Sequence, residues 1–465
     1  MMRVRSGLLV VLAVACFLAN ASPAYPQGST AVAQLNGTVL DESGATVKGA
    51  TLTLRQTDTN RSYTITSNDS GYYALANLPP GHYELTTASK GFATTVRKSI
   101  ELSVGQSATI DVTLKVATHG ETVVVTSETP VIEPTKTEIS HVINTQEISS
   151  LPISGRLFTD FALLTPGVAT GRTGLQSTFT EFEVTRVSFG GMRDLSNLVT
   201  VDGADNINTA TSSQRSTPPQ EAISEFRVVN GSFGAEYGRA LGGIVNIVTK
   251  SGGNDFHGSL YDYLQNNATD ARSLLQPAPQ SDTLRQNQFG ATAGGPIKKD
   301  KTFFFVNYEG QRRGESPTYP TTLLEPVLAF SNTAPFAPTV QTTNLALVNQ
   351  AKEALGIALE NINILKTKDN DYGIVKVDDQ LNADNHLTMR YNIEDGRDLN
   401  QLVGSTLDGG GIGAPSSGRD VYLRDQSLVG TVATTLKPDE TPRIFASFKI
   451  AISSCAILYS CSTTG

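Results

Sequence analysis

The sequence contains no tryptophan, only three cysteines and only five histidines among its 465 residues. Cys16 lies near the start while Cys455 and Cys461 lie near the end, so the fold between them cannot depend on a disulfide. Charged residues make up 17% of the chain and the net charge is −8, which argues against a nucleic-acid partner because no basic surface is available to neutralise phosphates. No His-Glu-x-x-His pattern or nucleophile–base pattern occurs, so we expect no catalytic residue, no metal site and no cofactor.

Long apolar runs are also scarce. Arg3 and Arg5 precede an apolar run from Leu8 to Leu18, and small residues follow it. This pattern predicts a secretory signal peptide over residues 1–24. The run is shorter than the roughly 20 apolar residues that span a bilayer, and no other run approaches that length. If the protein resides in a membrane, it must therefore cross it with strands.

Turn-forming residues are abundant and divide residues 33–115 into seven short β-rich segments. Apolar residues alternate along them, as at Leu52 and Leu54, so one face of each strand can be buried. We therefore expect a seven-stranded β-sandwich. The expected strands are Ala33–Leu40, Ala50–Gln56, Ser62–Thr66, Tyr72–Leu78, Gly81–Ala88, Thr94–Leu102 and Gln106–Leu114.

A linker over residues 116–138 contains an isolated β-prone segment with polar and proline-bearing flanks. The segment consists of Glu121, Thr122, Val123, Val124, Val125 and Thr126. An extended, unpaired segment of this kind can add itself as a strand to the edge of a partner's sheet. It could also be a last strand of the sandwich or a plain linker.

Residues 139–252 predict a compact α+β domain. Short helices are expected at Gln146–Leu151 and Phe158–Leu164, each ended by a proline. β-rich runs occur at Phe226–Val229 and Ile244–Thr249. The acidic stretch Asp202–Asn206 lacks the ligand spacing of a calcium loop, so we interpret it as a turn, with substrate contact as the second choice.

Residues 253–450 show the clearest strand alternation. Leu387, Met389, Tyr391 and Ile393 fall on one face of a strand, and Thr388, Arg390 and Asn392 fall on the other. Alternation of this kind predicts membrane-spanning strands with apolar residues toward lipid and polar residues toward a lumen. We expect about seven such strands, a long extracellular loop over Pro317–Asn370 with a helical patch at Leu345–Leu359, and an atypical tail over residues 451–465.

The most specific stretches of the sequence are Gly234–Arg239, reading GAEYGR, and Gly242–Gly252, reading GGIVNIVTKSG. They resemble the junction between plug and barrel in TonB-dependent outer-membrane receptors, in particular the Oar-like group. That group has an N-terminal carboxypeptidase regulatory-like domain, which Asp69–Tyr73 and Leu78–Tyr83 of this chain also resemble. The resemblance implies a mainly β protein with an N-terminal seven-stranded β-sandwich, an α+β plug domain and an antiparallel transmembrane β-barrel. It also implies that Val187–Arg193 and Leu198–Ala204 contain central strands of the plug. Such transporters close about 22 strands, so the barrel is expected to be incomplete and the chain to be a truncated or fragmentary form.

The resemblance also implies a function. It predicts a receptor in the outer membrane of a Gram-negative bacterium that takes up a small ligand (a siderophore, carbohydrate or peptide) with energy from a TonB-type transducer. Residues 121–126 would be the Ton box that binds this transducer, and the implied plug–barrel contacts are Arg193, Glu236, Tyr237 and Arg239. The alternative from another class is a secreted or surface β-sandwich protein that binds carbohydrate or a protein partner.

Overall fold

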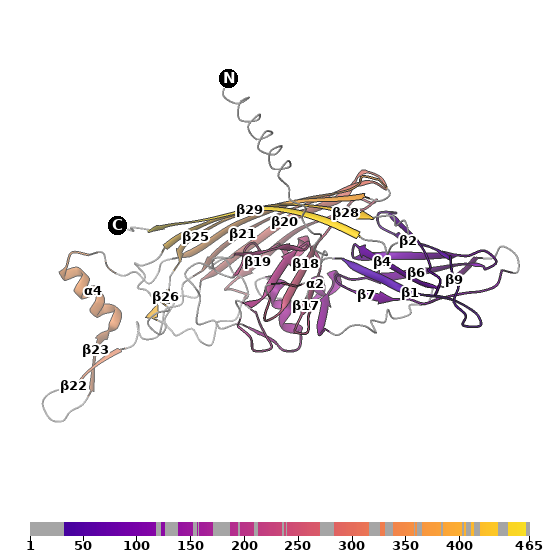
Figure 1. The fold of residues 1–465 in the computed structure, drawn as a ribbon. Coiled ribbons are helices and arrows are strands. Elements are labelled where there is room, and N and C mark those ends of the chain that lie inside the picture. The colour runs from indigo at the N-terminus through magenta and orange to yellow at the C-terminus, as the bar shows by residue number, and fades with distance from the viewer. Residues whose placement is uncertain are drawn as a thin grey trace, which may run out of the picture.

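The structure is a computed structural model that describes residues 32–117, 122–125, 138–151, 156, 158–170, 187–193, 196–208, 213–234, 237–238, 240–269, 283–315, 326–330, 338–357, 359, 365–382, 385–401, 404–405, 411–412, 419–435 and 445–461. Strands dominate these residues and form three parts in chain order: a sandwich, a central domain and a long curved sheet (Figure 1). The sandwich lies beside one end of the long sheet (Figure 1). None of the helices in the described ranges is long and apolar enough to cross a membrane.

The sandwich consists of two sheets that share an apolar core. One sheet has the order β4-β1-β7 with β8 also paired to β1, and the other has the order β3-β2-β5-β6-β9. Burial alternates along the strands as the sequence predicted; in β2, for example, Leu52 and Leu54 are fully buried between exposed or half-buried neighbours. The strands are β1 (Ala33–Asp41), β2 (Thr51–Gln56), β3 (Ser62–Thr66), β4 (Tyr72–Leu78), β5 (Gly81–Ala88), β6 (Thr94–Leu102), β7 (Ser107–Thr109), β8 (Val112–Leu114) and β9 (Thr122–Val125).

The last strand expected in this domain, Gln106–Leu114, is divided into β7 and β8. Both halves pair in parallel with β1. Between them, the Asp111 carboxylate accepts a hydrogen bond from the backbone N–H of Thr38 at 2.8 Å. A side chain thus replaces a backbone partner and interrupts the ladder, which alternation alone did not reveal.

The central domain (residues 138–250) is built on a five-stranded sheet of order β10-β17-β18-β13-β14. The strands are β10 (Ser140–Ile143), β13 (Leu198–Val201), β14 (Ala204–Asp205), β17 (Ile223–Val229) and β18 (Ile244–Thr249). β18 pairs antiparallel with β17 and parallel with β13, and five of its six residues are buried. The β-branched run at Ile244–Thr249 is therefore a buried central strand, as its composition predicted.

Short helices and small ribbons cover this sheet. α2 (Thr145–Ser150) begins with a capping box in which Asn144 and Glu147 bond each other's backbone N–H groups. η2 (Phe158–Leu164) is a 3₁₀ helix, and its Phe161 ring lies 6.2 Å from that of Phe226. Both predicted helices are present. The remaining elements are β11 (Val168–Thr170), β12 (Val187–Phe189), β15 (Ile207–Asn208), β16 (Ser213–Gln214) and η5 (Gln220–Ala222).

The expected strand within Val187–Arg193 does not belong to the central sheet. It is β12, which pairs only with β11 in a separate two-stranded ribbon in the described part of the chain. Phe189 of β12 nevertheless lies fully in the core, directly over Gly243, where an added Cβ would lie 2.2 Å from the ring. Glycine at position 243 thus permits a close approach that any side chain would block.

The long sheet has seven antiparallel strands in sequence order, β19-β20-β21-β24-β25-β28-β29. All seven expected strands are present, and β19 and β29 are its edges among the described residues. β29 continues to Cys461, so most of the segment expected as an atypical tail is strand. The bounds are β19 (His257–Asn266), β20 (Leu284–Lys298), β21 (Thr302–Glu315), β24 (Lys366–Gln380), β25 (Asn385–Gln401), β28 (Arg419–Thr435) and β29 (Phe445–Cys461).

The connection between β21 and β24 carries its own small elements. α4 (Asn344–Ala354) overlaps the helical patch predicted at Leu345–Leu359, and it follows a hairpin of β22 (Pro326–Phe330) and β23 (Pro338–Thr343). The loop expected to reach Asn370 ends earlier, because β24 begins at Lys366. A further ribbon of β26 (Gly404–Ser405) and β27 (Gly411–Ile412) lies between β25 and β28.

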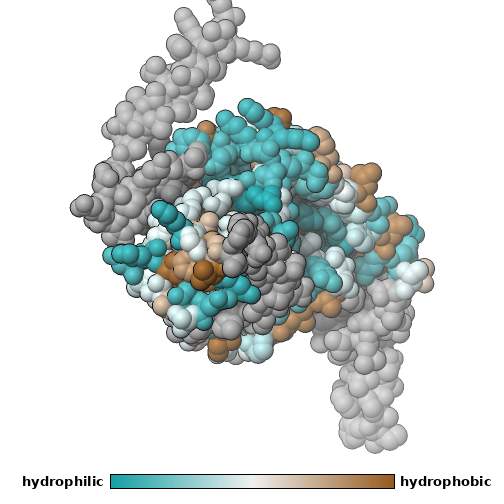
Figure 2. All heavy atoms as spheres, turned by 90° about the vertical axis from the view of Figure 1, so that its right-hand side faces the viewer, coloured by the Kyte–Doolittle hydropathy of each residue, from teal (hydrophilic) through white to brown (hydrophobic). Residues whose placement is uncertain are grey.

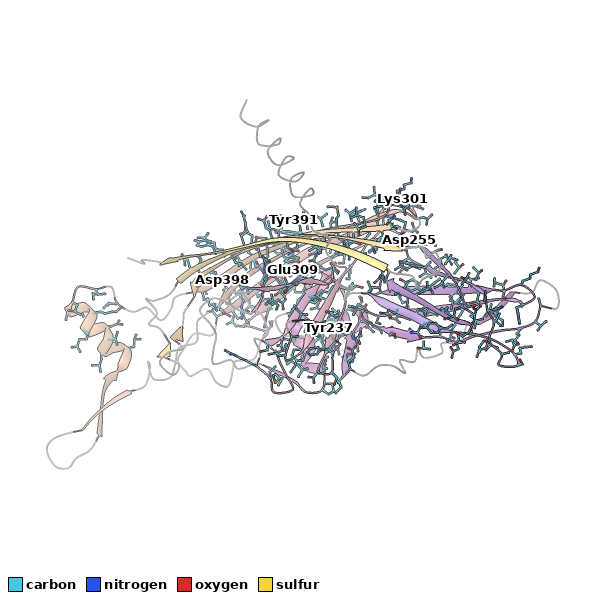
Figure 3. The ribbon with its side chains drawn as sticks, viewed as in Figure 1. Tyr237, Asp255, Lys301, Glu309, Tyr391 and Asp398 are labelled. Atoms are coloured by element: carbon cyan, nitrogen blue, oxygen red, sulfur yellow. The ribbon has the colours of Figure 1, made fainter. Side chains whose placement is uncertain are left out.

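The long sheet has an apolar exposed face and a polar buried face, which is the reverse of a sheet in a water-soluble protein. Large apolar side chains are exposed on the outer face, where Figure 3 shows Tyr391. Polar side chains are buried on the face toward the central domain, where Figure 3 shows Glu309. The exposed set includes Leu260, Leu264, Phe289, Tyr308, Val375, Met389, Tyr391 and Leu428, and the buried set includes Gln286, Gln288, Asn307, Glu309, Lys376, Arg390, Asn392, Glu394 and Asp425. The predicted alternation along β25 is confirmed, and it is the pattern of strands between lipid and a polar lumen.

Candidate functional site between the central domain, the long sheet and the sandwich

The turn at Asp202 carries the first contact between the central domain and the long sheet. Asp202 and Gly203 form a two-residue turn between β13 and β14, with φ values of +48° and +69°. The Asp202 carboxylate accepts hydrogen bonds from the backbone N–H of Thr249 at 2.9 Å and from its hydroxyl at 2.7 Å. β18 thereby fixes the direction in which the carboxylate points.

Two cations of the sheet meet that carboxylate. Arg390 of β25 donates to Asp202 Oδ2 at 3.1 Å, and Lys376 Nζ of β24 lies 3.6 Å from Oδ1. Lys376 also donates to the carbonyl of Thr249 at 3.1 Å. Burial alone would raise the pKa of Asp202, but the two cations and the Thr249 hydrogen bonds outweigh it and hold the pKa below its ordinary value. The turn is therefore an ion-pair anchor, and the described residues contain no cluster of His, Cys, Asp or Glu that could hold a metal ion.

A second contact involves the segment that follows β16. Arg215 pairs with Asp425 of β28 at 2.5 Å, and the backbone N–H of Thr217 donates to Glu394 of β25 at 3.3 Å. Asn370 of β24 donates to the other oxygen of Glu394 at 2.9 Å. Here the cation belongs to the central domain and the anions to the sheet, so the two contacts have opposite polarity.

A third contact lies at the first strand of the sheet. Arg156 pairs with Glu221 at 3.1 Å and lies over the Tyr263 ring of β19, 3.6 Å from its centre. Such a cation–π contact is strongest when it is partly desolvated. Beside it, the Tyr261 hydroxyl donates to Glu309 at 2.8 Å. These three contacts are polar, and a smaller apolar one lies beside them, where Ala222 packs against Phe305, Tyr372 and Ile374 of the sheet.

The sandwich contacts the central domain through the loop after β6. The backbone N–H of Val104 donates to the Glu225 carboxylate at 2.7 Å, and Arg227 donates to the Val104 carbonyl at 3.2 Å. Arg227 also pairs with Glu138. Burial raises the pKa of Glu225 to about 7, and the negative charge of Glu101 adds to that shift while the Val104 hydrogen bond opposes it.

The sandwich also reaches the long sheet. Asn60 donates to Asp300 Oδ1 at 2.8 Å, and Asn254 donates to the same oxygen at 2.8 Å. The backbone N–H of Asn254 donates in turn to the Asp58 carbonyl at 2.9 Å. Asp300 lies in the turn between β20 and β21, next to Lys301, which Figure 3 places at the sandwich end of the sheet.

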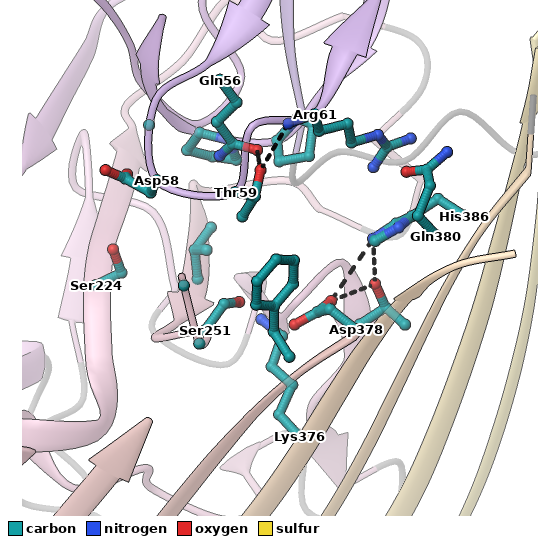
Figure 4. Close-up of a pocket in the computed structure, with 18 of the residues that line it drawn as sticks. Gln56, Asp58, Thr59, Arg61, Ser224, Ser251, Lys376, Asp378, Gln380 and His386 are labelled. Atoms are coloured by element: carbon teal, nitrogen blue, oxygen red, sulfur yellow. Dashed lines mark hydrogen bonds and ion pairs between the residues drawn. The ribbon is translucent and has the colours of Figure 1, made fainter. Parts of the chain in front are cut away.

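These three parts enclose a cavity of about 490 Å³. Its lining includes Arg61 from the sandwich, Thr249 from the central domain, and Asp378 and His386 from the sheet. Figure 4 shows Arg61 extending toward His386 across the cavity. The lining also contains buried polar atoms without a hydrogen-bond partner in the described part of the chain: Asp378 Oδ2, Gln380 Oε1, His386 Nδ1 and Arg390 Nε. Such atoms need water or a polar ligand as a partner. Seen from the sandwich end, the surface of the molecule is mostly hydrophilic, with separate hydrophobic patches (Figure 2).

Of the four residues predicted as contacts between the central domain and the barrel, the structure describes two. Arg193 is exposed, while Tyr237 is buried against Val229 and Ile244 of the central domain and accepts a hydrogen bond from Asn246 at 3.3 Å. Glu236 and Arg239 lie outside the described residues.

The sequence patterns did not identify the residues that join the central domain to the long sheet. Their signal was a charged side chain at an inward position of an alternating strand, as at Lys376, Arg390 and Asp425. The β-prone segment of the linker forms β9 over Thr122–Val125, while Glu121 and Thr126 lie outside the described residues.

Comparison with known families accounts for all three parts. Residues 34–115 match the carboxypeptidase regulatory-like domain, residues 135–244 match the TonB-dependent receptor plug domain, and residues 248–440 match an outer membrane beta barrel domain. The chain therefore belongs to the TonB-dependent receptor family, with the domain order that the sequence motifs indicated. The central domain is the plug, and the long sheet is part of the barrel wall. The family implies the outer membrane of a Gram-negative bacterium, and its members are receptors and transporters.

Two curated relatives are TonB-dependent proteins by name. The chain is 27% identical over 310 residues to the TonB-dependent transporter Oar of Myxococcus xanthus, a match that covers 63% of this chain and 28% of Oar. It is 29% identical over 193 residues to the probable TonB-dependent siderophore receptor PirA of Acinetobacter baumannii, covering 39% of this chain and 23% of PirA. Among solved structures, the siderophore receptor PirA of Pseudomonas aeruginosa aligns with 70% of this chain and 42% of that receptor, at 13% identity and a TM-score of 0.41. The chain thus spans less than a third of the length of the two curated relatives.

Proposed function

We propose that the chain acts in a TonB-dependent outer-membrane receptor that takes up a small ligand, with energy supplied by a TonB-type transducer in the periplasm. The observation that carries this proposal is the anchor at Asp202, where a plug turn is held by Lys376 and Arg390 of the barrel wall. A plug held by buried ion pairs, with only a small apolar contact of Ala222 against Phe305 and Ile374, can be released when water solvates the separated charges. No bond of the ligand is made or broken in this function, so the proposed activity is transport and not catalysis.

The transducer would bind the segment Glu121–Thr126, of which Thr122–Val125 is extended as β9. Binding by strand addition uses backbone groups, so the valine-rich sequence serves to keep the segment extended. We also propose that the leader over residues 1–24 is cleaved on export. The ligand is a siderophore, a carbohydrate or a peptide; PirA is by name a siderophore receptor, and the name of Oar states no ligand.

The test is to express the chain with its own leader in a Gram-negative host and to separate the membranes. We expect the protein in the outer membrane, extractable only with detergent, and able to bind the purified periplasmic domain of the host's TonB. Val124→Pro should abolish that binding because proline lacks the N–H that strand addition needs. Val124→Ile, which keeps a β-branched side chain, is the matched control. Recovery of a folded protein from the soluble periplasm would instead support a secreted sandwich protein.

A further inference from the structure

The segment proposed to bind the transducer is not a free strand in this structure. β9 pairs in parallel with β6, with Thr94, Thr95, Val96 and Arg97 opposite Thr122, Val123, Val124 and Val125. In the sheet order β3-β2-β5-β6-β9 it is the edge strand, so one of its sides is bonded to the sandwich and the other carries no strand in the described part of the chain.

The chain just before β9 is also held against the sandwich. Phe92 and Val116 form an antiparallel bridge, and the backbone N–H of Ala117 donates to the Gly91 carbonyl at 3.1 Å. Between Ala117 and Thr122 lie only residues 118–121. The sandwich therefore determines where the segment lies and how it is oriented, rather than leaving it on a long tether.

In an edge strand, the backbone N–H and C=O groups of successive residues point alternately toward the sheet and away from it. Along β9, every second residue directs its N–H and C=O toward β6, and the residues between direct theirs outward. A strand that is already extended has lost the conformational freedom that strand addition normally removes, so a second partner on the outer edge binds a preorganised template. Pairing on the inner edge would require β9 first to leave β6 and would leave that edge of the sandwich exposed.

We propose that a strand of the TonB-type transducer pairs with the outer edge of β9 while β9 stays on β6, so that the sandwich is part of the docking surface. This inference rests on the proposed function, since it assigns the binding geometry of the same segment. Force applied to β9 then acts on the sandwich as well as on the plug. The sandwich passes that force to the plug through Val104 and Glu225, and to the barrel wall through Asn60 and Asp300.

A reversible crosslink distinguishes outer-edge pairing from strand exchange. Val96 and Val124 are Cα partners across the β6–β9 pair, and Val96 is only half-buried, so it is accessible to oxidant. The variant Val96→Cys/Val124→Cys is made in a background in which Cys16, Cys455 and Cys461 are serine. Binding of the periplasmic domain of TonB to the detergent-solubilised full chain is then measured by interferometry, oxidised and reduced. Val124→Cys alone is the control for the effect of the side chain.

We expect the oxidised variant to bind within about twofold of the reduced one, or more tightly, because the crosslink preserves the outer edge. A loss of tenfold or more on oxidation that reductant restores would show that β9 leaves the sandwich, and would overturn the proposal. Failure of the two cysteines to crosslink would overturn it too, because the β6–β9 pair would then be absent from the protein in solution. If the crosslink forms but the reduced protein and the cysteine-free parent do not bind, the proposed function itself is wrong, which is a different result from strand exchange.

Discussion

Asp202 in a turn of the plug lies 3.1 Å from Arg390 on the inner face of the barrel wall, although 188 residues separate them in the chain. The contact joins two features that the sequence showed separately: an acidic turn and a charged residue among alternating apolar ones. Its role follows from burial, since a carboxylate and a guanidinium removed from water are stable only when they are paired.

Removing the Asp202 charge should therefore loosen the plug. In Asp202→Asn, Lys376 and Arg390 remain buried without their anion, which typically costs about 3–5 kcal/mol. We expect faster hydrogen exchange in β13 and β18 and a lower unfolding temperature for the plug. Asp205→Asn in the same hairpin is the control, because Asp205 is exposed and accepts a local hydrogen bond from Ile207 N–H. Equal effects of the two variants would contradict the anchor.

The contact between sandwich and plug should weaken as pH rises. The pKa of Glu225 is about 7 in the folded protein against 4.5 as its ordinary value. Between these values the folded state holds a proton that the unfolded state has lost, so stability falls with rising pH and levels off above pH 7. The full change is roughly 3 kcal/mol.

Glu225→Gln removes the titrating group while keeping a carbonyl oxygen that can accept from Val104. Its unfolding free energy, measured in denaturant at pH 5 and pH 8, should depend less on pH than that of the parent. The variant should exceed the parent in unfolding free energy by more at pH 8 than at pH 5, because only the parent has to bury a charge at pH 8. If the unfolding free energies of the parent and of Glu225→Gln change equally between pH 5 and pH 8, Glu225 does not have a raised pKa.

The fold could be predicted largely because its signals are periodic and local. Alternation along Leu387–Ile393 identified β25 and its faces, and turn residues separated the strands of the sandwich. What the sequence could not reveal depends on contacts between distant residues. The split between β7 and β8 requires the Asp111–Thr38 hydrogen bond, and the pairing of β12 with β11 rather than with the plug sheet follows from neighbours far along the chain.

The site was harder to predict for the same reason. Tyr237 belongs to the most specific motif of the sequence, yet it packs inside the plug on Val229 and Ile244. Lys376 and Arg390 belong to no motif, but they hold the plug turn. Motif strength therefore indicated the family, whereas the inward positions of the barrel strands indicate where plug and wall meet.

The glycines of the plug motif should differ sharply in their tolerance of a side chain. An added Cβ at Gly243 would lie 2.2 Å from the Phe189 ring, whereas one at Gly238 would meet no atom of the described residues within 4 Å. Because overpacking a core typically costs about 1–3 kcal/mol, Gly243→Ala should lower the unfolding temperature of the plug. Gly238→Ala should leave it nearly unchanged. Similar melting curves for the two variants would show that Phe189 does not occupy this position.

The outward residues of the barrel strands should tolerate apolar but not charged substitutions when the protein is in a membrane. Met389 is exposed on the outer face of β25, between the buried Arg390 and the inward-facing Thr388. A charged residue facing lipid costs from about 1 kcal/mol near the interface to about 2–4 kcal/mol at the bilayer centre, so Met389→Arg should reduce the amount of folded protein in outer-membrane fractions. Met389→Leu keeps the apolar surface and is expected to behave like the parent. If Met389→Arg instead accumulates in the membrane to the same level as Met389→Leu, the outer face of β25 does not contact lipid.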